Sequence, residues 1–279
     1  MPIDTTADRP PAFGCHQPSP AASALIRLCH ALPANGLGRR LALILRRLVL
    51  STAGAMLDAR VRGLTLRVHL KDNVSERKFL FMPQFFDVKE FALIERELPG
   101  DGVFLDIGAN AGIYSLWAAS HLGPQGRVLA IEPNPVMVER LVTNAAFNPF
   151  GARIETAACA ITDLKGTIRL NIDASNLGGS SVVESHAQGI DVPCLPLLDL
   201  LAEKGIGRID ILKIDVEGAE DQALVPFLDH ADAGLLPRFV IIERSGPRWR
   251  VNVVERLRQR GYTLHDESRM NHILRRTDA

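Results

Sequence analysis

The stretch FLDIGANAGIYS, residues 104–115, decides the fold of this chain. Its first part is a short apolar run typical of a buried strand, and a helix is predicted over 113–122, after Gly108 and Gly112. A tight turn between a strand and a helix brings backbone N–H groups to the carboxyl end of the strand. Doubly wound sheets bind their ligands at that edge. The stretch therefore predicts an α/β protein with a ligand site at this turn.

Strands and helices alternate through the rest of the chain. Five buried strands are predicted, at 103–105, 128–131, 154–160, 209–214 and 239–242. Further helices are predicted at 135–146 and 197–204. Continuous apolar strands separated by helices are typical of a parallel sheet covered on both faces. Two short runs, 262–264 and 272–274, predict an antiparallel hairpin at the sheet edge, and the insert 165–195 predicts another strand pair with a loop beside the site.

The N-terminal part has a different composition. Residues 1–20 contain five prolines and no hydrophobic period, which predicts a disordered leader. Residues 21–70 contain eight arginines and one acid, Asp58, which predicts a basic helical extension before a catalytic domain over 71–279. In the helix predicted at 37–50, one side carries Leu41, Ile44, Leu45, Leu48 and Val49, and the other carries Arg39, Arg40, Arg46 and Arg47. We expect the apolar side to pack on the catalytic domain or a second subunit rather than on anionic lipid.

Composition excludes several classes of protein. The 279 residues contain 32 Lys+Arg and 32 Asp+Glu, and zero net charge argues against a general nucleic-acid binder. The four cysteines form no C-x-x-C pair, which argues against a zinc ribbon or a thioredoxin-type site. No apolar run approaches about 18 residues, and the first twenty residues lack a signal-peptide pattern. These features predict a reduced, cytoplasmic protein.

The turn indicates which nucleoside cofactor it binds. Glu132 follows the second strand, 20 residues after Gly112, and an exposed carboxylate there can accept both hydroxyls of a ribose. A dinucleotide fingerprint needs glycine where this chain has Asn110 and Ile113. Asp106 suits a cationic amino group better than a phosphate. An NAD-dependent oxidoreductase is therefore the second choice, and an ordinary strand-turn-helix without a cofactor remains open.

The fourth strand turns from apolar to charged near its carboxyl end. Side chains alternate along a strand, so Lys213, Asp215 and Glu217 are expected around the pocket. Asp215 is the first candidate for a general base or an acceptor-positioning group, with Glu217 beside it. The alternative is a structural ion pair between Lys213 and Asp215. A metal held by Asp215, Glu217 and Glu243 is possible, but no ligand spacing demands one, and none is predicted.

Other polar residues give weaker signals. Asp163, after the third strand, is expected near an adenine or as a turn cap. Single histidines are more often surface or core residues than catalytic bases, which applies to His69, His186 and His265. Cys194 follows Pro193 but precedes a helix instead of ending the fourth strand, which argues against a nucleophile.

Four motifs together resemble the FkbM family of S-adenosylmethionine-dependent class I methyltransferases. They are FLDIGANAGIYS at 104–115, IEPNP at 131–135, ILKIDVEGAE at 211–220 and VIIE at 240–243. The similarity runs over about residues 64–275, with departures at Arg244 and at 84–86. The cofactor-binding residues that we expect are Asp106, Gly108, Asn110, Gly112, Glu132, Asn134 and Asp163.

The resemblance implies a Rossmann-like sheet, S-adenosylmethionine as cofactor, and O-methylation of a hydroxyl on a saccharide or secondary metabolite. The partner would then be a small-molecule or saccharide acceptor, without nucleic acid, and a homo-oligomer is possible. A binding protein without activity on the same fold is the alternative outside enzymes. The intact set of Asp106, Gly108, Gly112 and Glu132 argues against it.

Overall fold

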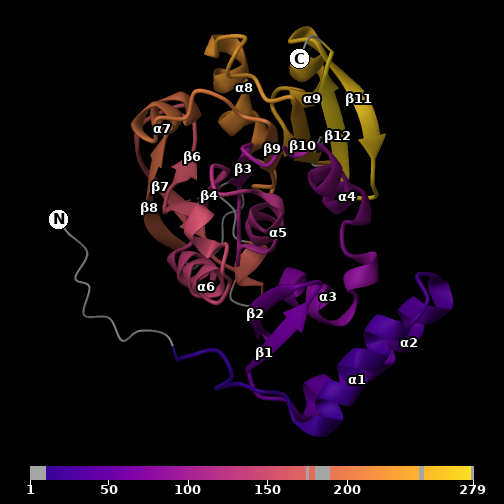
Figure 1. Ribbon diagram of the computed structural model, residues 1–279. Coiled ribbons are helices and arrows are strands. Elements are labelled where there is room, and N and C mark those ends of the chain that lie inside the picture. The colour runs from indigo at the N-terminus through magenta and orange to yellow at the C-terminus, as the bar shows by residue number, and fades with distance from the viewer. Residues whose placement is uncertain (1–10, 174–175, 180–188, 245–247, 278–279) are drawn as a thin grey trace.

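The structure is a computed structural model that describes residues 11–173, 176–179, 189–244 and 248–277. Its centre is a seven-stranded sheet in the order β11-β12-β10-β9-β3-β4-β5 (Figure 1). The strands are β3 (Val103–Ile107), β4 (Arg127–Ile131), β5 (Ile154–Ala157), β9 (Ile211–Ile214), β10 (Phe239–Glu243), β11 (Tyr262–Glu267) and β12 (Asn271–Arg276). The pairs β3–β4, β4–β5, β3–β9 and β9–β10 are parallel. Chain order reverses between β3 and β9, which makes this the switch point of the sheet.

The expected antiparallel hairpin is present at one edge. β12 pairs antiparallel with both β10 and β11, so the hairpin extends the parallel strands. This arrangement confirms the predicted α/β class and the Rossmann-like sheet with its C-terminal edge hairpin.

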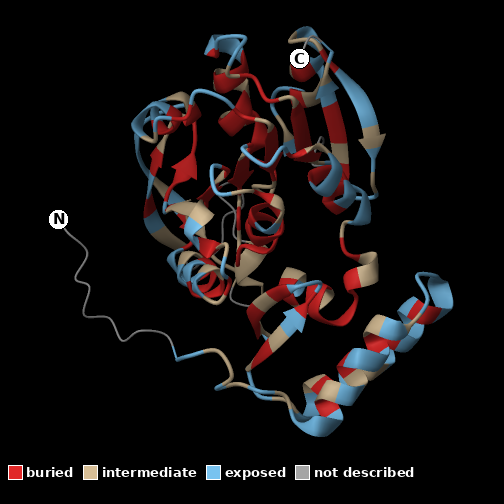
Figure 2. Cartoon of the chain, in the orientation of Figure 1, coloured by how far each residue is buried: buried red, intermediate tan, exposed pale blue. Residues whose placement is uncertain are grey.

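Helices cover both faces of the sheet because alternate strand residues point to opposite sides. One face carries Phe104 and Ile211 and packs against α4 (Val88–Glu97), α5 (Ile113–His121) and α6 (Pro135–Ala146). The other face carries Leu105 and Leu212 and packs against α7 (Leu197–Glu203), α8 (Glu220–His230) and α9 (Val253–Gln259). Figure 2 shows the central strands as mostly buried.

A small three-stranded sheet follows β5, and here the boundaries differ from the prediction. The strand predicted over 154–160 divides into β5 and β6 (Ala160–Ile161), since Cys159 donates its N–H to the carbonyl of Ala157 in a tight turn. β6 pairs with β8 (Gly189–Leu195), which pairs antiparallel with β7 (Gly166–Asn171). β7 and β8 are the strand pair expected in the insert, and η3 (Leu177–Gly179) lies between them.

The N-terminal part contains more structure than predicted. α1 (Pro20–Ala31) starts with Ser19 as its N-cap, a start signal hidden in the proline-rich run. α2 (Gly36–Thr52) and an antiparallel hairpin, β1 (Met56–Val61) with β2 (Leu64–His69), follow it. α3 (Val74–Phe81), which Asn73 caps through its side chain, and η1 (Pro83–Phe85) come next.

Residues 11–20 correct the expectation of a disordered leader over 1–20, whose first ten residues lie outside the described part. Arg67 donates to the carbonyls of Pro11 and Ala12, and Asp58 accepts the N–H groups of Gly14 and His16. The Arg67 and Asp58 side chains form a buried ion pair at 2.8 Å. The segment is therefore fixed to the β1–β2 hairpin by a charged network that the sequence pattern does not reveal.

The expected packing of α2 holds only in part. Of the predicted apolar side, Val49 is buried and Leu45 packs on the core, whereas Leu41, Ile44 and Leu48 are exposed. Gly38 and Ala42 complete the packed side, with Ala42 against Cys29 of α1. Among the described residues, no helix is long and apolar enough to cross a bilayer.

Candidate active site

The turn after β3 is shaped by residues with positive φ. Gly108 has φ 78°, and a Cβ there would lie 1.9 Å from the carbonyl oxygen of Asp215, so only glycine allows β3 and β9 to approach so closely. Gly112 has φ 88° and precedes α5, with Leu141 of α6 packed against it. Asn110, at φ 52°, uses an uncommon backbone region in which Asn is enriched. The turn is therefore fixed by its own geometry.

Glu132 holds this turn in place from the end of β4. Its carboxylate accepts the N–H of Asn110 at 2.8 Å and the N–H of Asn134 at 2.9 Å. The residue is only 7% exposed, which corrects the expectation of an exposed carboxylate. A carboxylate has about four lone-pair positions, so two hydrogen bonds leave room for two hydroxyl donors. Glu132 can thus support the turn and bind a ribose at once.

Glu132 lines a hollow with apolar walls. Cys159, Ala160 and Ile161 form one wall, and Val216 and Ala219 contribute another. Leu177 and Gly178 of η3 also line it, and Asn134, the N-cap of α6, donates from its side chain to the carbonyl of Leu177. An apolar slot beside a ribose acceptor suits a flat, weakly polar base such as adenine.

Lys213 and Asp215 follow at the carboxyl end of β9. The Nζ atom of Lys213 donates to the carbonyl of Gly108 at 3.1 Å, and lies 3.6 Å from Oδ1 of Asp106 and 3.7 Å from Oδ2 of Asp215. Burial lowers the pKa of Lys213, but the carboxylates of Asp215 and Asp106 outweigh it and raise that pKa, so the ammonium stays charged. The Asp215 side chain is 41% exposed and faces the hollow. Asp215 therefore pairs with Lys213 and also presents an accessible carboxylate to the hollow.

Asp106 occupies a different place from the one expected. It is fully buried, it accepts the hydroxyl of Ser115 at 2.7 Å, and it does not line the hollow. A direct bond from Asp106 to a cofactor ammonium therefore does not fit this geometry. Asp106 contacts the site indirectly, through its ion pair with Lys213.

Glu217 reaches the hollow by a route other than strand alternation. β9 ends at Ile214, and Glu217 adopts φ 54°, directly before Gly218. Burial and the nearby carboxylates of Asp215 and Glu243 raise the pKa of Glu217 to about 7. Its carboxylate lies 3.7 Å from Arg248. A carboxyl group with this pKa can take up a proton near neutral pH.

Three carboxylates gather here, from Asp215, Glu220 and Glu243. The expected metal alternative had Glu217 in place of Glu220. Glu220 already accepts the N–H groups of Val216 and Gly218 and the indole N–H of Trp249. These bonds give Glu220 a structural role at the start of α8.

A second hollow adjoins the first at Gly108, Gly178 and Asp215. Sequence reasoning missed two of its residues, Tyr114 and Asp87. The Tyr114 hydroxyl donates to Asp87 at 3.0 Å, and Lys213 Nζ lies 5.2 Å from the centre of the Tyr114 ring. Tyr114 stands in the quoted turn motif, and Asp87 in the aromatic stretch before it, but no spacing rule connects them.

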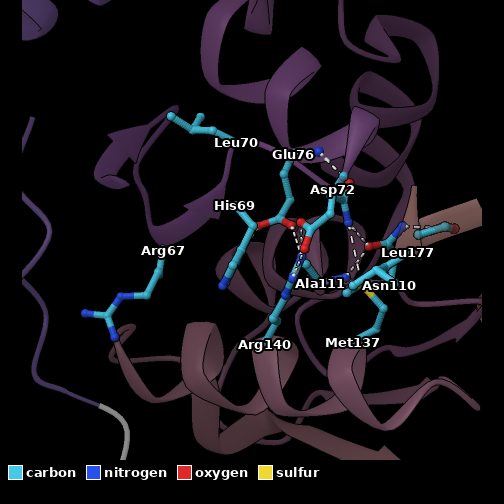
Figure 3. Close-up of polar contacts among 12 residues, drawn as sticks. Arg67, His69, Leu70, Asp72, Glu76, Asn110, Ala111, Met137, Arg140 and Leu177 are labelled. Atoms are coloured by element: carbon cyan, nitrogen blue, oxygen red, sulfur yellow. Dashed lines mark hydrogen bonds and ion pairs between the residues drawn. The ribbon is translucent and has the colours of Figure 1, made fainter. Parts of the chain in front are cut away.

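Residues at the start of α3 form polar contacts with the turn after β3 and with Leu177 of η3, both of which line these hollows (Figure 3). Asn73 donates to Asn110 Oδ1 at 2.7 Å, and Leu177 donates its N–H to the carbonyl of Asp72 at 2.8 Å. Arg140 of α6 bridges Asp72 and Glu76. The amide of Asn110 is thus fixed between Asn73, the N-cap of α3, and Gly178.

The remaining predicted residues lie elsewhere. Asp163 is exposed in the bend after β6 and lines neither hollow, which corrects its expected place beside the adenine. His69 lies near Glu76, and His265 packs on Phe239 at the outer hairpin. Cys194 is buried in β8. His186 lies outside the described residues.

Comparison with known families agrees with this geometry. The family model described as "Methyltransferase FkbM domain" matches residues 106–272, more than half of the chain. The chain belongs to the FkbM methyltransferase family. The match begins at Asp106, near the end of β3, and ends in β12, so it includes the turn after β3 and the carboxyl ends of β4 and β9.

Two relatives of this FkbM chain illustrate the similarity. "31-O-demethyl-FK506 methyltransferase FkbM" of Streptomyces tacrolimicus is 31% identical over 184 residues, which cover 54% of this chain and 69% of that protein. "Methyltransferase sdnD" of Sordaria araneosa is 30% identical over 158 residues, which cover 46% of this chain and 61% of that protein. The chain therefore spans less than two thirds of sdnD.

Solved structures of methyltransferases also resemble the chain. Methyltransferase FkbM from Methylobacillus flagellatus KT is 16% identical with a TM-score of 0.40, covering 73% of this chain and 54% of that one. O-methyltransferase TomG from Streptomyces achromogenes, crystallised with SAM, is 15% identical with a TM-score of 0.40, covering 72% and 84%. Scores this low add nothing to the family assignment, which rests on the sequence match.

The residues of this FkbM site fit S-adenosylmethionine by their chemistry. Glu132 offers free lone pairs to a ribose, the walls at 159–161 offer an apolar slot to a base, and the second hollow offers the ring of Tyr114 to the charged end. An aromatic ring attracts a sulfonium or ammonium cation. The donor set therefore suits a cationic nucleoside better than a diphosphate.

Cofactor binding should depend on pH through Glu132. Burial raises its pKa from 4.5 to about 7, although the N–H groups of Asn134 and Asn110 oppose the shift. Below this pKa the carboxyl carries a proton that must leave before it can accept both ribose hydroxyls. Because the ionised fraction rises from about one tenth to about nine tenths between pH 6 and pH 8, affinity for S-adenosylhomocysteine should rise about tenfold.

Calorimetry across this pH range measures the effect. Glu217→Gln is the control because Glu217 has a similar pKa, and the rise should persist in this variant. A flat profile in the unaltered protein, or a rise that disappears with Glu217→Gln, would contradict the assignment to Glu132.

Proposed function

We propose that this protein is an S-adenosylmethionine-dependent methyltransferase that methylates a hydroxyl of a saccharide or secondary metabolite. The observation that carries the proposal is the meeting of Glu132 and Asp215 in adjoining hollows at the switch point of the sheet. A relative's printed name, 31-O-demethyl-FK506 methyltransferase, supports a hydroxyl as the acceptor. Membership in the family supports the methyl-transfer chemistry.

The residues would act by alignment and proton removal. When bound, S-adenosylmethionine supplies an activated methyl group on a sulfonium. Transfer would form a C–O bond at the acceptor oxygen as the S–CH3 bond breaks, and the hydroxyl proton would pass to a carboxylate. Asp215, which lines both hollows, would orient the hydroxyl and receive this proton. Glu217, with a pKa of about 7, is the second acceptor for the proton.

Lys213 would set the charge of the site. Its buried ammonium lies between Asp106 and Asp215, at 3.6 and 3.7 Å, and would orient the Asp215 carboxylate. Gly178 of η3 lines both hollows where they adjoin.

Thermal unfolding separates this function from its alternatives. S-adenosylhomocysteine at about 100 times its Kd should stabilise the protein by about 2.7 kcal/mol, whereas NAD should leave the melting temperature unchanged. Stabilisation by NAD alone would favour an oxidoreductase. Binding of S-adenosylhomocysteine without transfer of labelled methyl in a screen of glycans and cell extracts would favour a binding protein.

A further inference from the structure

A third hollow lies beside the reaction site, on the other side of Asp87. It is walled by α2, by α3 and the start of α4, and by the turn between β11 and β12. Its space amounts to about 1290 Å³, including the part open to solvent. We call it the basic groove, after Arg39 and Arg46 of α2 and Arg269 of the hairpin turn, which line it.

Asp87 connects the basic groove to the reaction site. It lines both the groove and the hollow that contains Lys213 and Asp215. Its carboxylate accepts Lys78 Nζ at 2.8 Å on the groove side and the Tyr114 hydroxyl at 3.0 Å on the other. The groove and this hollow therefore share the wall formed by Asp87.

The groove has more positive than negative charge. Of its two acids, Asp87 pairs with Lys78, and buried Glu90 accepts the amide of Asn271 on Oε1. The other oxygen of Glu90 has no hydrogen-bond partner among the described residues. Lys89 is paired with Asp266. Within the described parts of the chain, the three arginines form no ion pair. They remain available to an anion from outside the protein.

The availability of these arginines to an anion is clearest for Arg46. Its Nε atom is buried and has no hydrogen-bond partner among the described residues. Burial, followed by repulsion from Arg77 and Arg47, lowers its pKa from the usual value. A buried donor without a partner costs stability, and a guanidinium is matched best by the two oxygens of a phosphate or carboxylate. The Arg46 guanidinium, which lines the groove, is therefore suited to an oxyanion.

Apolar side chains adjoin these charges. Val74, Val88 and Met270 line the groove and are 49%, 50% and 49% exposed. Large exposed apolar side chains grouped around a concave surface are typical of a ligand site. The combination suits a molecule that is both charged and apolar.

We propose that the basic groove binds the methyl acceptor, and that this acceptor is an amphiphilic oxyanion. Arg39, Arg46 and Arg269 hold its phosphate or carboxylate, Val74, Val88 and Met270 cover its apolar segment, and its hydroxyl extends past Asp87 toward Asp215. This inference rests on the proposed function and narrows its substrate class.

Helix α2 supplies a matched control. Arg40 and Arg47 each follow one of the groove arginines in sequence, are exposed, and line no part of the groove. The double variants Arg39→Gln/Arg46→Gln and Arg40→Gln/Arg47→Gln remove the same charge from the same helix. Arg269→Gln tests the groove from the hairpin turn without altering α2.

The probe is octyl phosphate below its micelle concentration, titrated by calorimetry into protein saturated with S-adenosylhomocysteine. We expect the unaltered protein and Arg40→Gln/Arg47→Gln to bind it equally. Arg39→Gln/Arg46→Gln should lose at least about tenfold in affinity, and Arg269→Gln should also bind more weakly. Octyl glucoside, which has the same chain and no charge, should bind at least about tenfold more weakly to the unaltered protein.

Three results would overturn the inference: no binding of octyl phosphate, equal losses in the two double variants, or equal affinity for octyl glucoside. Failure of S-adenosylhomocysteine to bind would instead reject the proposed function, so the two failures are distinguishable. Vesicles containing anionic lipid separate the sources of the acceptor. Sedimentation lost in Arg39→Gln/Arg46→Gln supports a lipid-linked acceptor, and octyl phosphate binding without sedimentation supports a free one.

Discussion

Asp215→Asn should lower the rate of methyl transfer by about 10² to 10⁴-fold while leaving affinity for S-adenosylhomocysteine almost unchanged. Asparagine keeps the shape of the side chain but cannot accept a proton, and it weakens the orientation of the hydroxyl. The cofactor contacts at Glu132 and the turn do not involve the Asp215 carboxylate. Single-turnover kinetics with labelled S-adenosylmethionine, paired with calorimetry, measure both quantities.

The alternative for Asp215 is a structural ion pair with Lys213, and it makes a different prediction. Because Asp106 also lies within 3.6 Å of the Lys213 ammonium, the lysine keeps one carboxylate in the variant. If transfer is unchanged at every pH and only the melting temperature falls, the structural role is the correct one. Glu217→Gln provides the comparison. If the transfer rate of that variant no longer falls below about pH 7, Glu217 is the proton acceptor. Transfer should also survive exhaustive EDTA treatment.

The sequence predicts the sheet and the position of the site well, for a physical reason. Gly108 and Gly112 are required by backbone geometry, and Glu132 follows the neighbouring strand, so local sequence determines both. Parallel strands end at the same edge of a sheet, which brings these residues to Asp215 without knowledge of the rest of the fold. The spacing of motifs within the parallel sheet was therefore sufficient.

Residues from outside the parallel sheet could not be placed in the same way. Asn73 and Asp87 are the N-caps of α3 and α4, which precede the sheet. Asn73 meets the site through Asn110 of the turn, and Asp87 meets it through Tyr114 of α5. The helical period of α2 shows two sides, but it does not show that Gly38 and Ala42 form the packed one. Contacts between residues distant in sequence determine the positions of Asn73 and Asp87 and the packed side of α2, and no local sequence pattern predicts such contacts.

The burial of Glu132 changes what a substitution there is expected to do. Glu132→Ala removes the acceptor for two backbone N–H groups, so the protein should lose about 1–3 kcal/mol of unfolding free energy for each donor left buried. A sequence-based expectation of an exposed carboxylate predicts no loss. Urea unfolding of the two proteins measures this difference.

Cofactor affinity should fall further than stability in the same variant. Hydrogen bonds from two ribose hydroxyls to a carboxylate contribute about 1.5–3 kcal/mol each, and 1.4 kcal/mol corresponds to a factor of ten, so affinity should drop at least about 100-fold. Asp163→Ala removes an acid that is exposed and lines neither hollow, and it should change neither affinity nor stability. Glu132→Gln keeps one carbonyl acceptor and should bind with intermediate affinity that no longer rises between about pH 6 and pH 8. If calorimetry finds the affinity of a folded Glu132→Ala protein unchanged, the ribose lies elsewhere and the cofactor site is wrongly assigned.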